Sequence, residues 1–233
     1  MMSNLKKYLA MKELLKLIGN SSDIIITGSF NNLFYNSQFG RLPEDLDLSM
    51  PNNEVYNSFL SMVEQNAKSF HIIDELNHFE FKKLVLLRRM NSFEELINLE
   101  IFIEERPPHN KCVLKPSFDD KPVELLGMDL NLFLAMKLYS YLELIEYPEL
   151  QRYKDLYDLL ILTSAHYNIS EVKKFYDELS IKYGSMEHIV ETFNQEKELI
   201  YLSELNKLEI DTFGKQCLVQ KNATDVKKLI LTL

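Results

Sequence analysis

The hydrophobic positions at the start of the chain repeat with the period of an α-helix and then switch to that of β-strands. Apolar residues at positions 5, 9, 14, 15 and 18 fall near helical spacing, and Gly19 follows them as a stop, so we expect a helix over residues 4–18. A β-branched run over residues 23–27 predicts a strand, which Gly28 and Ser29 interrupt before a brief helical segment. Residues 44–49 then return as a second strand.

The middle of the chain continues this alternation, and the rest of it is helical. A helix is expected over residues 54–67, strands over 69–76, 79–89 and 96–103, and an edge strand over 112–114. Beyond a polar linker at 116–122 the strand signal stops. Helices are expected over 130–145, from about residue 150 onward, over 170–183 with Ser170 as N-cap, and over 186–208 and 224–231. The sequence therefore predicts an α+β fold: a mixed sheet flanked by helices over residues 1–120, and an all-helical domain over residues 121–233.

Two aspartates, Asp45 and Asp47, occupy alternate positions of the predicted strand 44–49. Side chains two apart on a strand point to the same face, with Cα atoms ~6.5–7 Å apart, so the carboxylates project together while the leucines beside them enter the core. Such a pair suits two divalent ions ~3.5–4 Å apart that clamp the phosphates of a nucleoside triphosphate. Upstream, the turn at Gly28 and Ser29 enters a helical segment and exposes backbone N–H groups at which a phosphate can sit.

Two more charged residues stand out from apolar surroundings. Glu100 lies on one face of a strand expected beside the aspartate strand; an exposed surface residue is the alternative, and Glu95 and Glu104 are nearby competitors. Lys137 lies inside an apolar helical stripe formed by Leu130, Phe133, Leu134, Leu138 and Tyr141. A lysine in that position either extends its ammonium group outward or finds an anion, and both alternatives stay open.

Composition narrows the class of protein. The 233 residues carry a formal charge of −9, which argues against nonspecific coating of nucleic acid but allows a local basic groove. No apolar run approaches the roughly 20 residues of a membrane span. Cys112 and Cys217 have no metal-type spacing and favour reduced thiols, so we expect a cytoplasmic protein without membrane contact.

The order of strand, Gly-Ser, helical spacer and Asp-x-Asp resembles the signature of the polymerase-β-type nucleotidyltransferase superfamily. The segment GRLPEDLDLSM is similar to the motif of the AbiEii/AbiGii-like nucleotidyltransferases, the toxins of bacterial type IV toxin–antitoxin systems. Arg41, Glu44, Asp45, Leu46 and Asp47 match that motif, whereas Leu42-Pro43 replaces Phe-Ser. The later segments LFLAMKLYSYLEL and RYKDLYDLLIL are similar to the family's helical lysine motif and to its Arg/Lys-Asp-Leu-Tyr-Asp-Leu motif.

The resemblance implies a polymerase-β-like fold and an enzyme that depends on Mg²⁺ or Mn²⁺. The enzyme would move a nucleoside monophosphate from an NTP (ATP, GTP or CTP) to an acceptor and release pyrophosphate. By the resemblance, the metal ligands are Asp45, Asp47 and Glu100, the nucleotide-binding residues are Gly28, Ser29, Arg41 and Lys137, and the catalytic residues are Asp45, Asp47, Lys137 and Asp155. Asp155 would orient or deprotonate the acceptor or anchor Lys137, and Asp158 would be a structural partner.

The resemblance also implies an RNA acceptor such as the 3′ end of tRNA, toxicity through blocked translation, and a cognate antitoxin encoded as a separate protein. Two alternatives remain: the acceptor is a protein side chain or a small molecule, or the chain is a noncatalytic regulator that binds a nucleotide or a partner. The similarity covers about residues 24–162 and assigns no role to residues 165–233.

Overall fold

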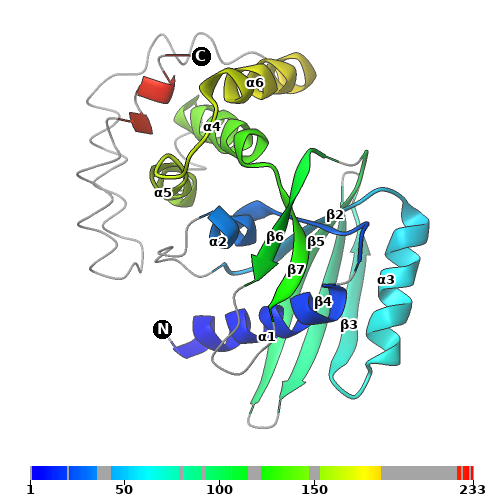
Figure 1. Cartoon of the computed structure of the whole chain (residues 1–233). Coiled ribbons are helices and arrows are strands. Elements are labelled where there is room, and N and C mark those ends of the chain that lie inside the picture. Colours follow the sequence, from blue (N-terminus) through cyan, green and yellow to red (C-terminus); the bar gives the residue numbers. More distant parts are fainter. Residues whose placement is uncertain are drawn as a thin grey trace. The chain divides into compact units, whose positions relative to one another are not determined.

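The fold is described from a computed structural model of the chain (Figure 1). The description covers residues 2–19, 21–35, 43–78, 81–90, 93–105, 107–114, 122–146 and 153–184, together with 225, 226, 228–230 and 232. The chain divides into two compact units. The first consists of Met1–Phe34 and Leu42–Met128, and the second of Tyr35–Arg41 and Asp129–Leu233.

The first unit is a seven-stranded mixed sheet with helices. In chain order its elements are α1 (Met2–Ile18), β1 (Ile25–Thr27), the 3₁₀ turn η1 (Gly28–Asn31), the start of α2 (Asn32–Tyr35), β2 (Leu46–Met50), α3 (Asn53–Gln65), β3 (Phe70–Asn77), β4 (Lys82–Met90), β5 (Phe93–Ile103), β6 (His109–Leu114) and β7 (Val123–Met128). The strand order is β3-β4-β5-β2-β1-β7-β6. β2 pairs antiparallel with β1 and parallel with β5, so it has a neighbour on each side.

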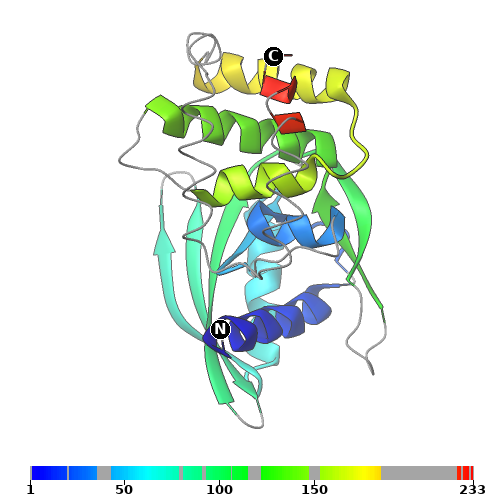
Figure 2. The same cartoon turned by 90° about the vertical axis from the view of Figure 1, so that its left-hand side faces the viewer.

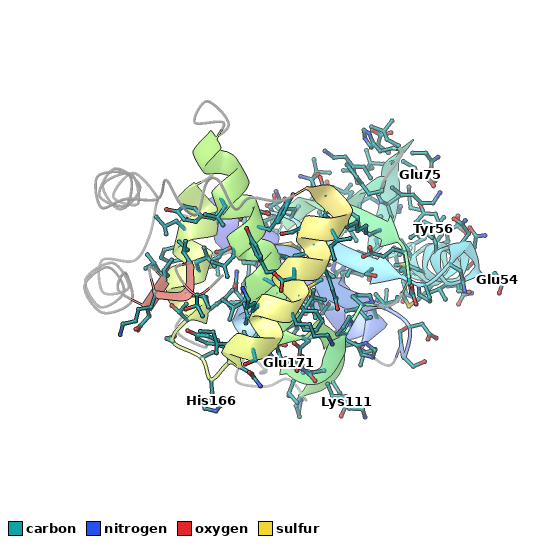
Figure 3. All side chains as sticks on the ribbon, turned by 90° about the horizontal axis from the view of Figure 1, so that it is seen from above. Glu54, Tyr56, Glu75, Lys111, His166 and Glu171 are labelled. Atoms are coloured by element: carbon teal, nitrogen blue, oxygen red, sulfur yellow. The ribbon has the colours of Figure 1, made fainter. Side chains whose placement is uncertain are left out.

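One face of this sheet forms the hydrophobic core with α1 and α3. Alternate strand residues point to it and are buried: Leu46, Leu48, Met50, Leu84, Leu86, Ile97, Leu99 and Ile101. They pack in one cluster with Leu14, Leu15 and Ile18 of α1 and with Tyr56, Phe59 and Val63 of α3. Tyr56 also donates a hydrogen bond of 2.6 Å to Glu75 of β3 (Figure 3). The intervening strand residues, Asp47 and Glu100 among them, point to the other face.

The second unit consists, in its described part, of α4 (Leu130–Glu146), α5 (Tyr153–Leu162), α6 (Ile169–Tyr183) and a few helical residues near the end of the chain. Figure 2 shows α4 between the other two helices, and it contacts both. The apolar stripe of α4 is buried as its spacing predicts, and α5 is buried at every position from Asp155 to Leu162. No helix in the described ranges is long and apolar enough to cross a membrane.

The structure confirms the α+β class and corrects two local expectations. Strand structure does not stop before residue 121, because β7 follows the polar linker and pairs in parallel with β1. The first unit accordingly runs to Met128, later in the chain than the division expected at residue 120. α6 is capped by Asn168 and not by Ser170. The side chain of Asn168 accepts a hydrogen bond of 3.0 Å from the backbone amide of Ser170. The helix expected over residues 186–208, as well as Arg41 and Cys217, lies outside the described residues.

Candidate active site

The carboxylate of Asp47 lies against the backbone turn at Gly28. Thr27, the last residue of β1, pairs with Asp47, and the chain then enters η1 with Gly28 at φ +58°. A Cβ atom placed on Gly28 would stand 1.5 Å from Oδ2 of Asp47. Position 28 therefore requires glycine for two reasons: its backbone is left-handed, and the carboxylate fills the space that a Cβ atom would take. This contact joins the Gly-Ser turn and the acidic strand in one place.

Glu100 lies beside Asp47 on the neighbouring strand. Strand registers align five residues in one row across the sheet: Thr27 of β1, Asp47 of β2, Glu100 of β5, Lys83 of β4 and Leu76 of β3. Paired residues on adjacent strands share a face, and adjacent strands lie about 4.8 Å apart. Asp47 and Glu100, both half-buried, are thus side by side on the face opposite the hydrophobic core.

The two competing glutamates occupy other positions. Glu95 pairs with Arg88, whose guanidinium lies 4.8 Å from the ring of Phe70 and approaches Glu13 of α1, so that pair faces the helices. Glu104 follows the end of β5 and is exposed. Of the three glutamates, Glu100 is the one paired with Asp47 itself.

Asp45 precedes the strand on which it was expected. β2 begins at Leu46, and Asp45 is a half-buried residue in a bend immediately before it. Within the described residues no group of three or more His, Cys, Asp or Glu side chains is arranged to hold a metal ion. The oxygen donors still suit Mg²⁺, because that ion keeps several waters and is commonly bound by one or two carboxylates together with substrate phosphates.

The second unit contains a buried ionic triad. The ammonium group of Lys137 on α4 donates to Oδ1 of Asp155 at 2.7 Å and lies 2.9 Å from Oδ2 of Asp158, both on α5. The aspartate side chains are 2% and 0% exposed and that of the lysine is 12% exposed. Three residues apart on a helix, the aspartates share a face and hold the lysine from two sides.

The charges of the triad determine its protonation. Burial by itself lowers the pKa of Lys137, but the charges and hydrogen bonds of Asp158 and Asp155 outweigh burial, so the pKa is raised. Lys137 is therefore a permanent cation at neutral pH. The lysine of the apolar stripe has its anion within the protein, and the sequence signal for this was two aspartates within the apolar run of α5.

The predicted site residues thus belong to two groups. Gly28, Ser29, Asp45, Asp47 and Glu100 are in the first unit, whereas Lys137 and Asp155 are in the second. Within the first group the structure brings Gly28, Asp47 and Glu100 together. In the second, Asp158 contacts Lys137 as directly as Asp155 does, although the sequence suggested only a structural role for it.

The fold is similar to that of two solved structures from Helicobacter pylori. The chain is similar to JHP933 from Helicobacter pylori at 15% identity and a TM-score of 0.59, covering 98% of this chain and 90% of that one. It is also similar to a candidate nucleotidyltransferase from H. pylori at 15% identity and a TM-score of 0.57, covering 98% of this chain and 93% of that one. No match is found among curated protein sequences.

A family match over most of the chain shows that it is a nucleotidyltransferase. Residues 29–223 match the nucleotidyl transferase AbiEii toxin of type IV toxin–antitoxin systems, and the chain belongs to this family. The resemblance inferred from the motifs is thereby confirmed.

Proposed function

We propose that the protein transfers a nucleoside monophosphate from an NTP to the end of an RNA, such as the 3′ end of tRNA, in a reaction that depends on Mg²⁺. The observation that carries the proposal is the contact of Asp47 with Gly28 on one side and its pairing with Glu100 on the other. This arrangement provides a carboxylate for a metal ion between a turn suited to phosphates and a second carboxylate.

The site residues of the first unit divide the tasks of this reaction among them. The backbone of Gly28 and Ser29 receives the β- and γ-phosphates, and Asp45 and Asp47 hold the metal ions. When bound, these ions neutralise phosphate charge and stabilise the attacking and leaving oxygens. Glu100 accepts the proton of the acceptor hydroxyl, or serves as a third ligand.

The chemical step balances without any further reactant. The acceptor oxygen attacks the α-phosphorus and forms a new P–O bond, while the bond from that phosphorus to the bridging oxygen of the β-phosphate breaks. Pyrophosphate leaves, and the hydroxyl proton goes to a carboxylate. The residues act mainly by positioning and by charge stabilisation.

We further propose that Lys137 and Asp155 serve the same reaction. Their motif supports this, as does the raised pKa that keeps Lys137 charged. Two roles were considered for Asp155: anchoring Lys137, and removing a proton from the acceptor. The 2.7 Å ion pair favours the first. A separately encoded antitoxin is the expected partner, since the family is that of type IV toxin–antitoxin systems.

The test is transfer of label from each α-labelled NTP to total cellular RNA with Mg²⁺, with Mn²⁺ or with chelator. We expect Asp47→Asn to lower transfer by at least about a hundredfold, in the range seen when a key charge-stabilising group is removed. Glu100→Gln should lower it strongly. Glu104→Gln is the matched control, because it changes an exposed carboxylate that follows the same strand, and it should retain full transfer.

The same assay separates the alternatives. If the label appears in protein or in a small molecule and not in RNA, the acceptor is that molecule and not RNA. NTP binding without pyrophosphate release in the presence of every acceptor pool would contradict the whole proposal. Undiminished transfer by Asp47→Asn would refute the assigned site.

A further inference from the structure

The direction of in-line transfer divides the sheet face into two sides. β1 and β5 flank β2, and the Gly28 turn proposed for the phosphates lies on the β1 side of Asp47. In an in-line displacement the attacking oxygen stands opposite the leaving group. With pyrophosphate leaving on the β1 side, the acceptor must approach over β5 and the strands beyond it, β4 and β3.

Aromatic side chains lie on that side of the site. Phe102 is two residues beyond Glu100 on β5 and therefore shares its face. The ring of Phe81 lies 5.7 Å from that of Phe102, and the ring of His78 stacks on Phe81 at 4.6 Å with an interplanar angle of 21°. We call His78, Phe81 and Phe102 the aromatic group; it is located where the β3–β4 hairpin meets β5.

A lysine is adjacent both to Glu100 and to the aromatic group. Lys83 pairs with Glu100 across the strands and follows Phe81 by two residues. Its side chain has no hydrogen bond or ion pair with any residue in the described ranges. His78 is exposed, and Phe81, Phe102 and Lys83 are half-buried, so the aromatic group and its cation retain surface toward solvent.

We propose that the aromatic group and Lys83 bind the end of a single-stranded RNA acceptor. This inference rests on the proposed function and adds to it the acceptor's side of the site. A terminal base stacks on the solvent-facing surface of these rings, since every base offers a π-face to an aromatic side chain. Lys83 pairs with the adjoining phosphate, and the ribose hydroxyl is thereby directed toward Glu100. Aromatic rings beside a lysine without an ion pair suit a base and its phosphate better than they suit a carboxylate-rich surface of a partner protein.

Direct binding tests the proposal without requiring turnover. The probe is a short single-stranded oligoribonucleotide with 2-aminopurine at its 3′ end, whose fluorescence falls when the base stacks. We expect the wild-type chain to quench the probe. Phe81→Leu keeps an apolar side chain but removes the ring, and should weaken binding about tenfold. Phe81→Tyr restores a ring and should bind like the wild type.

A third variant tests the phosphate contact, and a fourth is the control. Lys83→Gln should weaken binding and lower the dependence of log affinity on log salt by about one ion. Phe175→Leu makes the same aromatic-to-aliphatic change at a half-buried position of α6 and should leave quenching unchanged. Circular dichroism spectra should be the same for all four variants and the wild type.

Failure of this inference is distinguishable from failure of the proposed function. If the wild type labels RNA but Phe81→Leu and Lys83→Gln bind the probe and use RNA at wild-type concentrations, the acceptor site lies elsewhere and only this inference is overturned. If Phe81→Leu binds as well as Phe81→Tyr, the group is an apolar docking surface, which also overturns it. Probe binding that depends on both residues, without label transfer to RNA, would uphold the surface and refute the reaction.

Discussion

At the scale of single residues, Gly28 is the position where one atom decides whether the site exists. Gly28→Ala places a methyl group where Oδ2 of Asp47 lies and adds backbone strain at φ +58°, of roughly 1–2 kcal/mol. We expect the variant to fold with reduced stability and to lose Mg²⁺-dependent NTP binding, as measured by isothermal titration. Because the carboxylate of Asp47 has to leave its position, the loss of binding free energy for the NTP should exceed the loss in the free energy of unfolding.

Gly184 provides the matched control for that prediction. It also has a positive φ, +112°, but a Cβ there meets nothing within 4 Å. Gly184→Ala should therefore show the backbone strain without the loss of NTP binding. Equal NTP affinity in Gly28→Ala and wild type would show that the contact with Asp47 has no part in the nucleotide site.

The Lys137 triad makes a prediction about stability. Removing one member of a buried ion pair destabilises by about 3–5 kcal/mol, because uncompensated charge is left in the interior. Lys137→Met leaves Asp155 and Asp158 buried without their lysine, and should lower the free energy of unfolding in urea by about that amount. Adding Asp155→Asn and Asp158→Asn removes the stranded charges and should restore most of the loss.

The control for the triad is a surface ion pair. Lys111 and Glu124 are 2.6 Å apart with side chains 75% and 59% exposed, and Lys111→Met should leave unfolding unchanged because water screens such pairs. If Lys137→Met were no more destabilising than Lys111→Met, the triad would not be a buried charge cluster in solution. Inactivity of Lys137→Met has to be interpreted alongside its stability.

At the scale of elements, one hydrogen bond ties α3 to β3 and makes stability depend on pH. Burial raises the pKa of Tyr56, and the hydrogen bond and charge of Glu75 raise it further. The folded pKa thus exceeds the unfolded value of about 10. The contribution of this phenol to stability is full below pH about 10 and is lost as pH rises through the folded pKa.

Tyr56→Phe should therefore be less stable than the wild type by about 1 kcal/mol at neutral pH, the usual value of a hydrogen bond. The difference should shrink as pH rises above about 10. Urea unfolding at a series of pH values measures it. Tyr183→Phe, at a tyrosine whose 58% exposure leaves it in water, is the control and should show no such change. A constant difference between wild type and Tyr56→Phe would contradict the assignment.

The elements also show which structural information the sequence contained. The placement of Glu100 beside the aspartate strand was predictable, because alternation fixed its face and the strand was expected next to β2; the structure confirms that pairing. β7 was not predictable, because its pairing with β1 joins residues 101 positions apart and its six residues, VELLGM, alternate poorly. Local pattern does not specify such a contact.

Within the site, sequence reasoning identified the residue types and missed how they are combined. For the lysine in the apolar stripe, the residues alone left two alternatives open: an ammonium group that extends outward, or one that finds an anion. The structure shows two aspartates, and Asp158, the more buried, was the less expected. Asp45 was assigned to the strand because Asp-x-Asp alternates, yet β2 begins one residue later. The alternation of apolar and polar residues does not show at which residue strand pairing begins.

At the scale of the whole molecule, the proposed function makes a demand on both units. The carboxylates and the Gly-Ser turn belong to the first, and the Lys137 triad to the second. A ligand that binds only the folded state stabilises what it contacts, by about 2.7 kcal/mol at a hundredfold excess over Kd. If Lys137 and Asp155 serve the same reaction as Asp47, an NTP with Mg²⁺ must slow amide hydrogen exchange in α4 and α5 as well as in η1 and β2.

One variant in each unit makes this prediction specific. Asp47→Asn should abolish the slowing in all four elements, because the metal ion joins the phosphates to the chain. The variant with Lys137→Met, Asp155→Asn and Asp158→Asn removes all three charges of the triad and so leaves no buried charge stranded there; it should retain slowing in η1 and β2 but lose it in α4 and α5. Protection confined to η1 and β2 in the wild type would exclude Lys137 from the nucleotide site, and the triad would then be a structural feature of the helical unit alone.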